Sequence, residues 1–366
     1  MPDPRVTKLA KVLVHYSLEI QPGQQLSIRT HPLAEELTLA IYEEAIQAGA
    51  HVFIQASVPG SEEIFYKYAS DAQLDYISPL RKLITETFDA SLTIWTQHNT
   101  RSLSGIDPNR MARADRAGAP LFKTFLDRMA SRQIHWCGTA FPTHAAAQEA
   151  DMSLADYTEF VYGAGMLNDP DPVVHWKKVG QELQGLAERF KGHEQVVLKG
   201  SNVDLKMSIR DRIFLPCDGK ENFPDGEIFT GPVEDSVEGW VRFRYPAIAN
   251  GQEVTDIALW FEQGRVVKET ASKNQELLTA QLNTDAGARY LGEFGIGTNY
   301  GISRFTKEML FDEKMGGTIH LAVGAGLPES GSLNESGIHW DMLCDMQDAE
   351  MRVDGELFYK NGKFVS

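Results

Sequence analysis

Two histidines and an aspartate near the end of the chain are the residues best suited to chemistry. They lie in Thr318-Ile-His320-Leu-Ala-Val323 and Gly337-Ile-His339-Trp-Asp341-Met342, where polar and apolar side chains alternate. Side chains alternate across a strand, so His320 would point away from its apolar neighbours, and His339 and Asp341 would share one face. Two imidazoles and a carboxylate suit zinc, cobalt, manganese or iron. The pattern therefore predicts a divalent metal site.

A simpler interpretation exists for each of these residues. A single strand histidine is more often hydrogen-bonded than metal-bound, and the sequence has no HExxH helix or CxxC pair. Glu227 and Glu293 lie in glycine-containing segments that favour a functional role, although most glutamates are only solvated. The His-x-Asp pair favours the metal site.

The first half of the sequence alternates between helical and extended patterns. Apolar residues at helical spacing precede Gln25–Arg29, and a second helical stripe over Leu37–Ala48 precedes a strand at His51–Ala56. Ala90–Trp95 and Ile134–Cys137 are also typical of strands. This alternation predicts an α/β domain with a parallel sheet over residues 1–195. No GxGxxG or Walker motif follows a strand, so the sheet does not imply a nucleotide site.

The second half has a different texture. After the break at Asn168–Pro172, apolar residues from Trp176 to Phe190 recur at helical spacing, and Gly192 is the expected C-cap. Short alternating segments with turn signals follow. We expect residues 196–366 to form a mainly antiparallel β (α+β) metal-binding domain, with helices over Gln275–Leu282 and around Thr284–Leu291.

Composition excludes several classes of protein. The 366 residues carry a formal net charge of −16 without a Lys/Arg run, which argues against nucleic acid and anionic membranes as partners. No apolar run approaches the ~18 residues that span a bilayer, and the N-terminal segment lacks the apolar region of a signal peptide. Cys137, Cys217 and Cys344 are too far apart for a disulfide framework or a cysteine zinc site. We therefore expect a cytoplasmic enzyme.

Four segments, in order, resemble the successive motifs of the M29 aminopeptidases, the thermophilic aminopeptidase T family. They are Pro224-Asp-Gly-Glu-Ile-Phe-Thr-Gly-Pro232, Thr284-Asp-Ala-Gly-Ala-Arg-Tyr-Leu-Gly-Glu293, Leu310-Phe-Asp-Glu-Lys-Met-Gly-Gly-Thr-Ile-His-Leu-Ala-Val-Gly324 and Ile338-His-Trp-Asp341. The resemblance extends weakly to Asn99-Thr-Arg-Ser-Leu-Ser104 and Phe141-Pro-Thr-His-Ala-Ala-Ala-Gln148, so it covers most of the chain.

The resemblance implies a homodimeric aminopeptidase that uses two divalent metal ions (Zn, Co or Mn) to activate water against short peptides. Carried over by motif, the metal ligands are Glu227, Glu293, His320, His339 and Asp341. Glu227 and Glu293 are also the expected catalytic carboxylates, and Glu227 or Asp341 is the expected bridge between the ions. Such a pair would lower the pKa of a water and polarise the scissile carbonyl.

One position departs from the family pattern. The family has a tyrosine seven residues after the first metal-site histidine, and this chain has Leu327, which can neither donate a hydrogen bond nor bind metal. Tyr290 and Tyr300 are candidate substitutes, although a packing role is the simpler expectation for each. The departure predicts weak peptidase activity in a metal site that is otherwise complete.

Two alternatives follow from the same residues. A non-haem Fe(II) ring-cleaving dioxygenase of the dihydroxypyridine type has a similar architecture and would need only His320, His339 and Asp341. The number of bound ions separates it from a dinuclear peptidase. A catalytically dead member is the other alternative, but such a protein has no chemical reason to keep five ligands.

Overall fold

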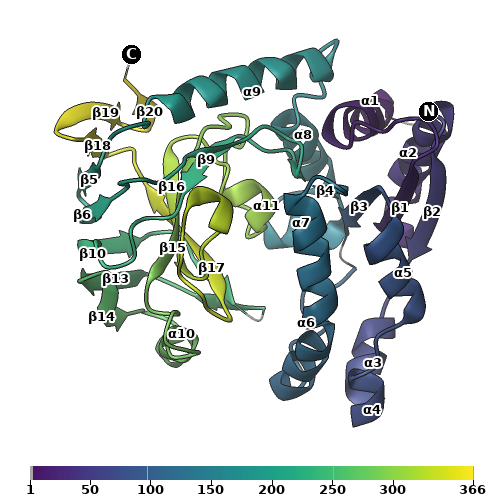
Figure 1. Ribbon diagram of the computed structural model, residues 1–366, viewed down its shortest axis with the longest axis horizontal. Helices are drawn as coiled ribbons and strands as arrows, with labels where there is room; N and C mark the ends of the chain where they lie inside the picture. The colour runs from purple at the N-terminus through teal and green to yellow at the C-terminus, as the bar shows by residue number, and fades with distance from the viewer. Residues whose placement is uncertain (1–2, 97, 250, 366) are drawn as a thin grey trace. The chain divides into compact units, whose positions relative to one another are not determined.

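The chain divides into two compact units, each described here by itself. The computed structural model describes residues 3–96, 98–249 and 251–365 (Figure 1). An N-terminal unit comprises Met1–Val174 with Gly219–Phe223, and a C-terminal unit comprises His175–Asp218 with Pro224–Ser366. The division thus falls at Val174 rather than near residue 195. The physical reason is that Leu183 and Phe190, which follow this point, are buried in the core of the C-terminal unit.

The N-terminal unit is built on a parallel five-stranded sheet of order β2-β1-β3-β4-β8. Its strands are β1 (Gln25–Thr30), β2 (His51–Ala56), β3 (Ala90–Trp95), β4 (His135–Ala140) and β8 (Asn222–Phe223). Its helices are α1 (Pro4–Val12), η1 (Leu13–Ser17), η2 (Pro32–Ala34), α2 (Glu35–Gln47), α3 (Ser61–Tyr68), α4 (Asp71–Leu74), α5 (Pro79–Thr87), α6 (Pro108–Ala130), α7 (His144–Glu149) and α8 (Leu154–Ala164). The predicted α/β fold with a parallel sheet is confirmed.

The C-terminal unit contains two larger β-sheets. One has eight strands in the order β14-β13-β10-β6-β5-β18-β19-β20, and the other has five in the order β17-β16-β15-β9-β7. The strands are β5 (Gln195–Gly200), β6 (Val203–Ser208), β7 (Leu215–Cys217), β9 (Glu227–Thr230), β10 (Glu238–Phe243), β11 (Ala247–Ala249), β12 (Gln252–Val254), β13 (Ile257–Glu262), β14 (Arg265–Thr270), β15 (Leu291–Gly297), β16 (Thr318–Gly324), β17 (His339–Asp345), β18 (Ala349–Val353), β19 (Glu356–Lys360) and β20 (Lys363–Phe364). Every described ladder in the two sheets is antiparallel, as predicted.

One hydrophobic core joins the two sheets of this unit. Leu205 of β6 and Leu321 of β16 belong to the same buried cluster, together with Leu183 of α9 (Pro172–Glu188). Three short helices complete the unit, namely α10 (Gln275–Leu282), α11 (Met309–Asp312) and η3 (Pro328–Ser330). Strand β16 is buried along its whole length. A polar side chain on that strand therefore needs a partner inside the protein.

Two local predictions are wrong. Residues 284–290 are not helical, because Asp285 accepts hydrogen bonds from the backbone N–H groups of Gly287 and Ala288 and closes a tight turn. Glu293 consequently lies within strand β15 and not at a helix end. Helix α9 ends at Glu188, and tight turns lead on to Gly192, whose φ is +81°. Gly192 is thus a turn residue beyond the helix and not its C-cap.

Within the described ranges, no helix combines the length and the apolar character needed to cross a membrane.

Candidate metal centre

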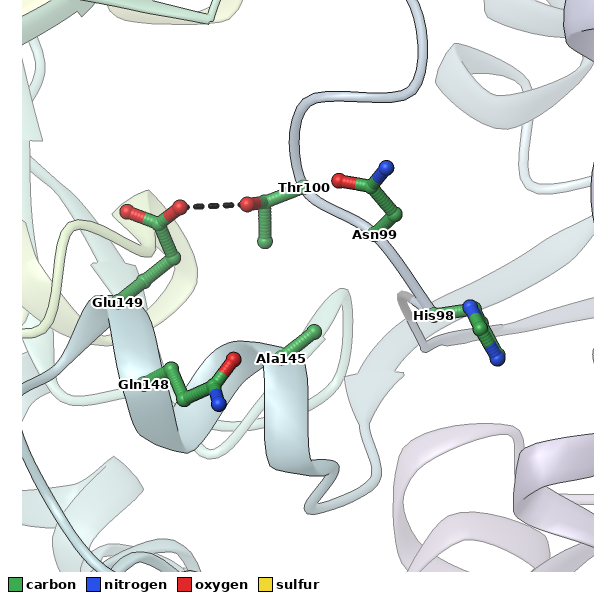
Figure 2. Close-up of a pocket in the computed structure, with 6 residues that line it drawn as sticks. All are labelled: His98, Asn99, Thr100, Ala145, Gln148 and Glu149. Atoms are coloured by element: carbon green, nitrogen blue, oxygen red, sulfur yellow. Dashed lines mark hydrogen bonds between the residues drawn. The ribbon is translucent and has the colours of Figure 1, made fainter.

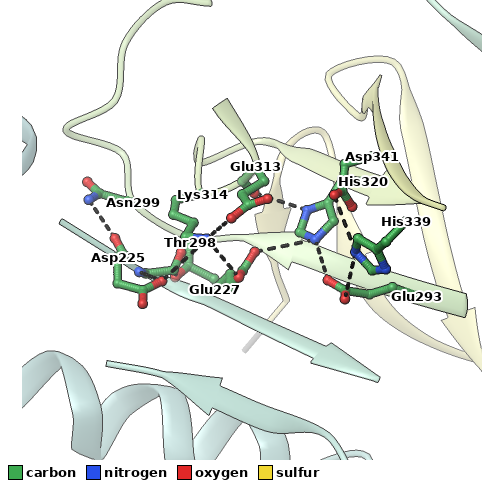
Figure 3. A network of polar contacts seen from close by, with 11 residues as sticks. Asp225, Glu227, Glu293, Thr298, Asn299, Glu313, Lys314, His320, His339 and Asp341 are labelled. Atoms are coloured by element: carbon green, nitrogen blue, oxygen red, sulfur yellow. Dashed lines mark hydrogen bonds and ion pairs between the residues drawn. The ribbon is translucent and has the colours of Figure 1, made fainter. Parts of the chain in front are cut away.

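Four adjacent strands of the antiparallel five-stranded sheet contribute polar side chains to one cluster. In the order β17-β16-β15-β9, the strands carry the His339–Asp341 pair, His320, Glu293 and Glu227. The register places Gly324 opposite His339 and Ala322 opposite both Asp341 and Glu293. The structure thus brings together all five residues predicted as ligands (Figure 3).

A glycine makes room for the central imidazole. Gly295 lies opposite His320, and a Cβ atom built on Gly295 would come within 2.0 Å of His320 Nε2. Any larger residue would displace the ring, so the glycine-rich sequence around Glu293 has a steric purpose.

Glu293 lies between the two imidazoles. Its Oε1 is 3.0 Å from His320 Nε2, and its Oε2 is 3.6 Å from His339 Nε2. Glu227 Oε2 is 3.4 Å from His320 Nε2, and Asp341 Oδ2 is 3.4 Å from His339 Nε2. Each imidazole is therefore flanked by two carboxylates, and Glu293 belongs to both pairs.

The backbone orients both rings for metal binding. His320 Nδ1 lies 3.1 Å from the carbonyl oxygen of Glu313, and His339 Nδ1 lies 2.7 Å from that of Ala325. A carbonyl accepts a hydrogen bond, so Nδ1 carries the proton and Nε2 keeps its lone pair in the neutral ring. This is the arrangement that metal-binding histidines adopt.

The site also contains buried carboxylate oxygens that lack a hydrogen-bond donor in the described part of the chain, as expected of metal ligands in a protein without its metal. Glu227 Oε2 and Asp341 Oδ1 are buried without a hydrogen-bond partner among the described residues. Buried carboxylate oxygens without a donor are costly, and coordination to a cation removes that cost. Glu293, His339 and Asp341 have ligand atoms within 4.8 Å of one another, close enough to share one ion.

Three residues in this network, namely Asp225, Glu313 and Lys314, escaped the sequence prediction. Lys314 is 1% exposed, and its ammonium group lies 3.1 Å from Glu227 Oε1, 3.9 Å from Asp225 Oδ1 and against the carboxylate of Glu313. Both Glu313 and Lys314 lie in the motif that contains His320. The signal that could have revealed them is the charged run Asp312-Glu313-Lys314, set between the apolar Leu310-Phe311 pair and a buried strand.

The charges of the cluster shift the ionisation of its members. Burial alone would lower the pKa of both imidazoles. The carboxylates around them have the larger effect and raise the pKa to about 10 for His320 and for His339. Burial raises the pKa of Glu293, and it raises the pKa of Glu313 to about 7 against the opposing charge of Lys314. Burial would raise the pKa of Asp341, yet the charge and hydrogen bond of His339 hold it at about 2. Without metal, the centre is thus a set of carboxylates neutralised by protons and by Lys314.

The position that replaces the family tyrosine lies in a loop. Leu327 is 40% exposed and directly precedes η3, and its carbonyl accepts hydrogen bonds from the backbone N–H and the hydroxyl of Ser330. Of the two candidate substitutes, Tyr300 donates its hydroxyl to the carbonyl of Gly362. That hydrogen bond commits the phenol of Tyr300 to the backbone.

The two N-terminal segments of the resemblance meet at a polar pocket of about 460 Å³ (Figure 2). Glu149 holds its wall together, since it accepts hydrogen bonds from the Thr100 hydroxyl at 2.5 Å and from the guanidinium of Arg101. The remaining lining residues are His98, Asn99, Ala145 and Gln148. This pocket lies wholly within the N-terminal unit.

Comparison with known proteins gives one consistent result. The model of the thermophilic metalloprotease (M29) family matches residues 3–364. Aminopeptidase 2 of Geobacillus stearothermophilus is 25% identical over an alignment 400 residues long, which covers 99% of this chain and 95% of that protein. Aminopeptidase T of Thermus thermophilus is 26% identical over 402 residues, which cover 97% of this chain and 95% of that protein. The solved structure of wild-type AmpT from Thermus thermophilus superposes with a TM-score of 0.87 at 23% identity and covers 99% of both chains.

Proposed function

This chain belongs to the M29 family of thermophilic metalloproteases, and we propose that it is a metal-dependent aminopeptidase that hydrolyses N-terminal residues from short peptides. The relatives that match nearly its whole length are named aminopeptidases. The observation that carries the proposal is the convergence of two imidazoles and three carboxylates from four adjacent strands.

Charge supports two divalent ions in this centre. Asp225, Glu227, Glu293, Glu313 and Asp341 carry five negative charges when ionised, and Lys314 carries one positive charge. The resulting net charge of −4 is the charge that two divalent cations would neutralise. Oxygen and imidazole ligands suit zinc, cobalt or manganese. Such ions would supply an activated water and polarise the scissile carbonyl.

We propose that Glu293 would contribute to holding both ions, a role expected from the sequence for Glu227 or Asp341. One of its oxygens faces each imidazole, whereas Glu227 approaches only His320 and Asp341 only His339. Glu227 with His320 would hold one ion, and His339 with Asp341 the other. The backbone carbonyls of Glu313 and Ala325 keep both rings in the required orientation.

Glu313 is the proposed proton carrier between the water and the departing amine. In the metal-free protein, burial raises its pKa to about 7, and its carboxylate is not one of those that face the imidazoles. Its side chain is 18% exposed, while Glu293, whose pKa burial also raises, has both oxygens directed at the imidazoles. Glu313→Gln should lower kcat by about 10² or more without changing metal content. An unchanged kcat would remove Glu313 from the mechanism.

Metal analysis of the purified protein, combined with a dipeptide assay, tests the proposal. We expect about two ions per chain and activity that a chelator abolishes and Co²⁺, Zn²⁺ or Mn²⁺ restores. Glu293→Ala should reduce the ion content and the activity together, whereas the exposed Glu329→Ala should change neither. Hydrolysis that persists in metal-free protein would refute the proposal.

The comparisons and the site give no support to a ferrous dioxygenase. The relatives named above are aminopeptidases, and Glu227 and Glu293, which a two-histidine, one-carboxylate iron site does not require, both lie against His320. One bound iron per chain and consumption of O₂ would instead indicate a dioxygenase.

We also propose a cytoplasmic homodimer. The three cysteines are all free thiols, as expected in a reducing compartment. Helix α2 and strand β2 of the N-terminal unit expose large apolar side chains, namely Leu39, Tyr42, Ile46, Phe53 and Ile54. A second copy of this unit would cover such a surface. Sedimentation analysis tests the dimer, and a monomer at micromolar concentration would refute it.

A further inference from the structure

A second group of metal-binding side chains lies beside the proposed centre, and Lys314 occupies it. Cys217, Asp225 and Glu227 have ligand atoms within 4.8 Å of one another. Strands β7 and β9 bring them together, because Cys217 pairs with Glu227 and the Gly226 N–H donates to the carbonyl of Cys217. A thiolate and two carboxylates are a ligand set for zinc or cobalt.

The ammonium group of Lys314 already serves as the cation of this group. It lies 3.1 Å from Glu227 Oε1 and 3.9 Å from Asp225 Oδ1, and it contacts the carboxylate of Glu313 (Figure 3). Lys314 and Asp225 are almost completely buried. A buried ammonium is retained only where anions surround it, so these carboxylates form a built cation site.

The two carboxylate oxygens of Glu227 face different partners, because Lys314 binds one of them. Oε1 faces the ammonium group, while Oε2 faces His320 Nε2 at 3.4 Å and has no hydrogen-bond partner among the described residues. With Oε1 held, Glu227 can offer only Oε2 to an ion beside His320.

We propose that Lys314 is a tethered cation that occupies a latent third metal site formed by Cys217, Asp225 and Glu227, and so limits metal binding to the His320 side of Glu227. The inference rests on the metal centre proposed above. Lys314 acts as a positioning residue, since it works through Glu227. Without the ammonium group, the cluster would carry one more uncompensated negative charge, and the place that the ammonium group occupies would be vacant.

Two variants that both remove the charge test this inference. Lys314→Ala empties the space, whereas Lys314→Met removes the charge but keeps most of the volume. Each purified protein is dialysed against Co²⁺, and its metal content and near-ultraviolet absorption are compared with those of the wild type. We expect Lys314→Ala to bind about one more ion per chain than the wild type, with thiolate-to-cobalt charge-transfer absorption, and Lys314→Met to bind no additional ion.

A second substitution locates the additional ion. Cys217→Ser in the Lys314→Ala background should abolish the charge-transfer absorption. The proposal is overturned if Lys314→Ala binds the same number of ions as the wild type, or if the absorption survives the loss of Cys217. The measurement is a difference between variants, so it can fail while the wild type still binds two ions and cleaves peptides.

If Lys314→Ala does not fold under the conditions used for the wild type, refolding in the presence of metal tests the same proposal. Lys314→Ala and Lys314→Ala/Cys217→Ser are then both refolded with Co²⁺. Recovery of folded protein that requires Cys217 supports the tethered cation, and equal recovery or equal failure of the two variants overturns it.

Discussion

The two imidazoles are cations in the metal-free protein. Their neighbouring carboxylates outweigh burial and hold the pKa of each at about 10. A histidine whose folded pKa is raised stabilises the fold fully below its unfolded value of about 6.5, and this contribution is lost as pH rises through the folded value. Metal must displace these protons, so metal affinity should rise with pH.

We therefore expect the free energy of unfolding of metal-free protein to fall between pH 7 and pH 10. His339→Gln should reduce that fall by about 1–2 kcal/mol, a figure discounted because 35% of the His339 side chain is exposed. Urea unfolding of both proteins at the two pH values provides the measurement. Equal slopes in wild type and variant would contradict the raised pKa.

Leu327 is the residue most expected to limit turnover. If a phenol at this place donates to the developing oxyanion, Leu327→Tyr should raise kcat on simple dipeptides by about 10² to 10³ and leave metal content unchanged. The position tolerates a larger polar side chain because it is 40% exposed in a loop. Steady-state kinetics decide the matter, and a tyrosine variant no faster than wild type would make Leu327 an ordinary loop residue.

Among the elements, strand β15 sets the geometry of the centre through residues that have no side chain. Gly295→Ala would bring a Cβ atom within 2.0 Å of His320 Nε2, so the ring must move. We expect metal affinity to fall about ten- to a hundredfold and stability to fall by about 1–3 kcal/mol. Titration calorimetry and thermal unfolding test both effects.

Gly185 in helix α9 provides the matched control. A Cβ atom there meets nothing within 4 Å, and the residue is exposed. Gly185→Ala should raise stability by roughly 0.5–1 kcal/mol with no change in metal affinity. Equal metal affinity in the two alanine variants would contradict the steric role of Gly295.

At the scale of the whole molecule, the proposed ions would bind within only one of the two units. The ligands lie on β9, β15, β16 and β17 of the C-terminal unit, and the parallel sheet of the N-terminal unit contributes none of them. Metal removal should therefore speed amide hydrogen exchange in those four strands and leave β1 and β3 protected. An equal loss of protection in the parallel sheet of the N-terminal unit and in the ligand-bearing sheet would contradict this prediction.

The sequence determined the elements and the ligand types. Strands β2 and β3 and helix α10 have the predicted bounds, because their periodicity and flanking turn residues are local signals. The alternation around His339 and Asp341 was sufficient to place both on one strand face. Family resemblance added Glu227 and Glu293, which no local pattern distinguishes from solvated glutamates.

Only the tertiary structure decided which side chains meet and what each one faces. Sequence spacing cannot show that Glu293 lies between two imidazoles, because the register of β15 against β16 depends on long-range pairing and on a bulge near Glu293. It also could not assign Lys314, since a lysine in a charged run is usually solvated and its burial depends on Asp225 and Glu227 from a distant segment. The unit boundary at Val174 likewise depends on which core receives helix α9, and local periodicity does not contain that information.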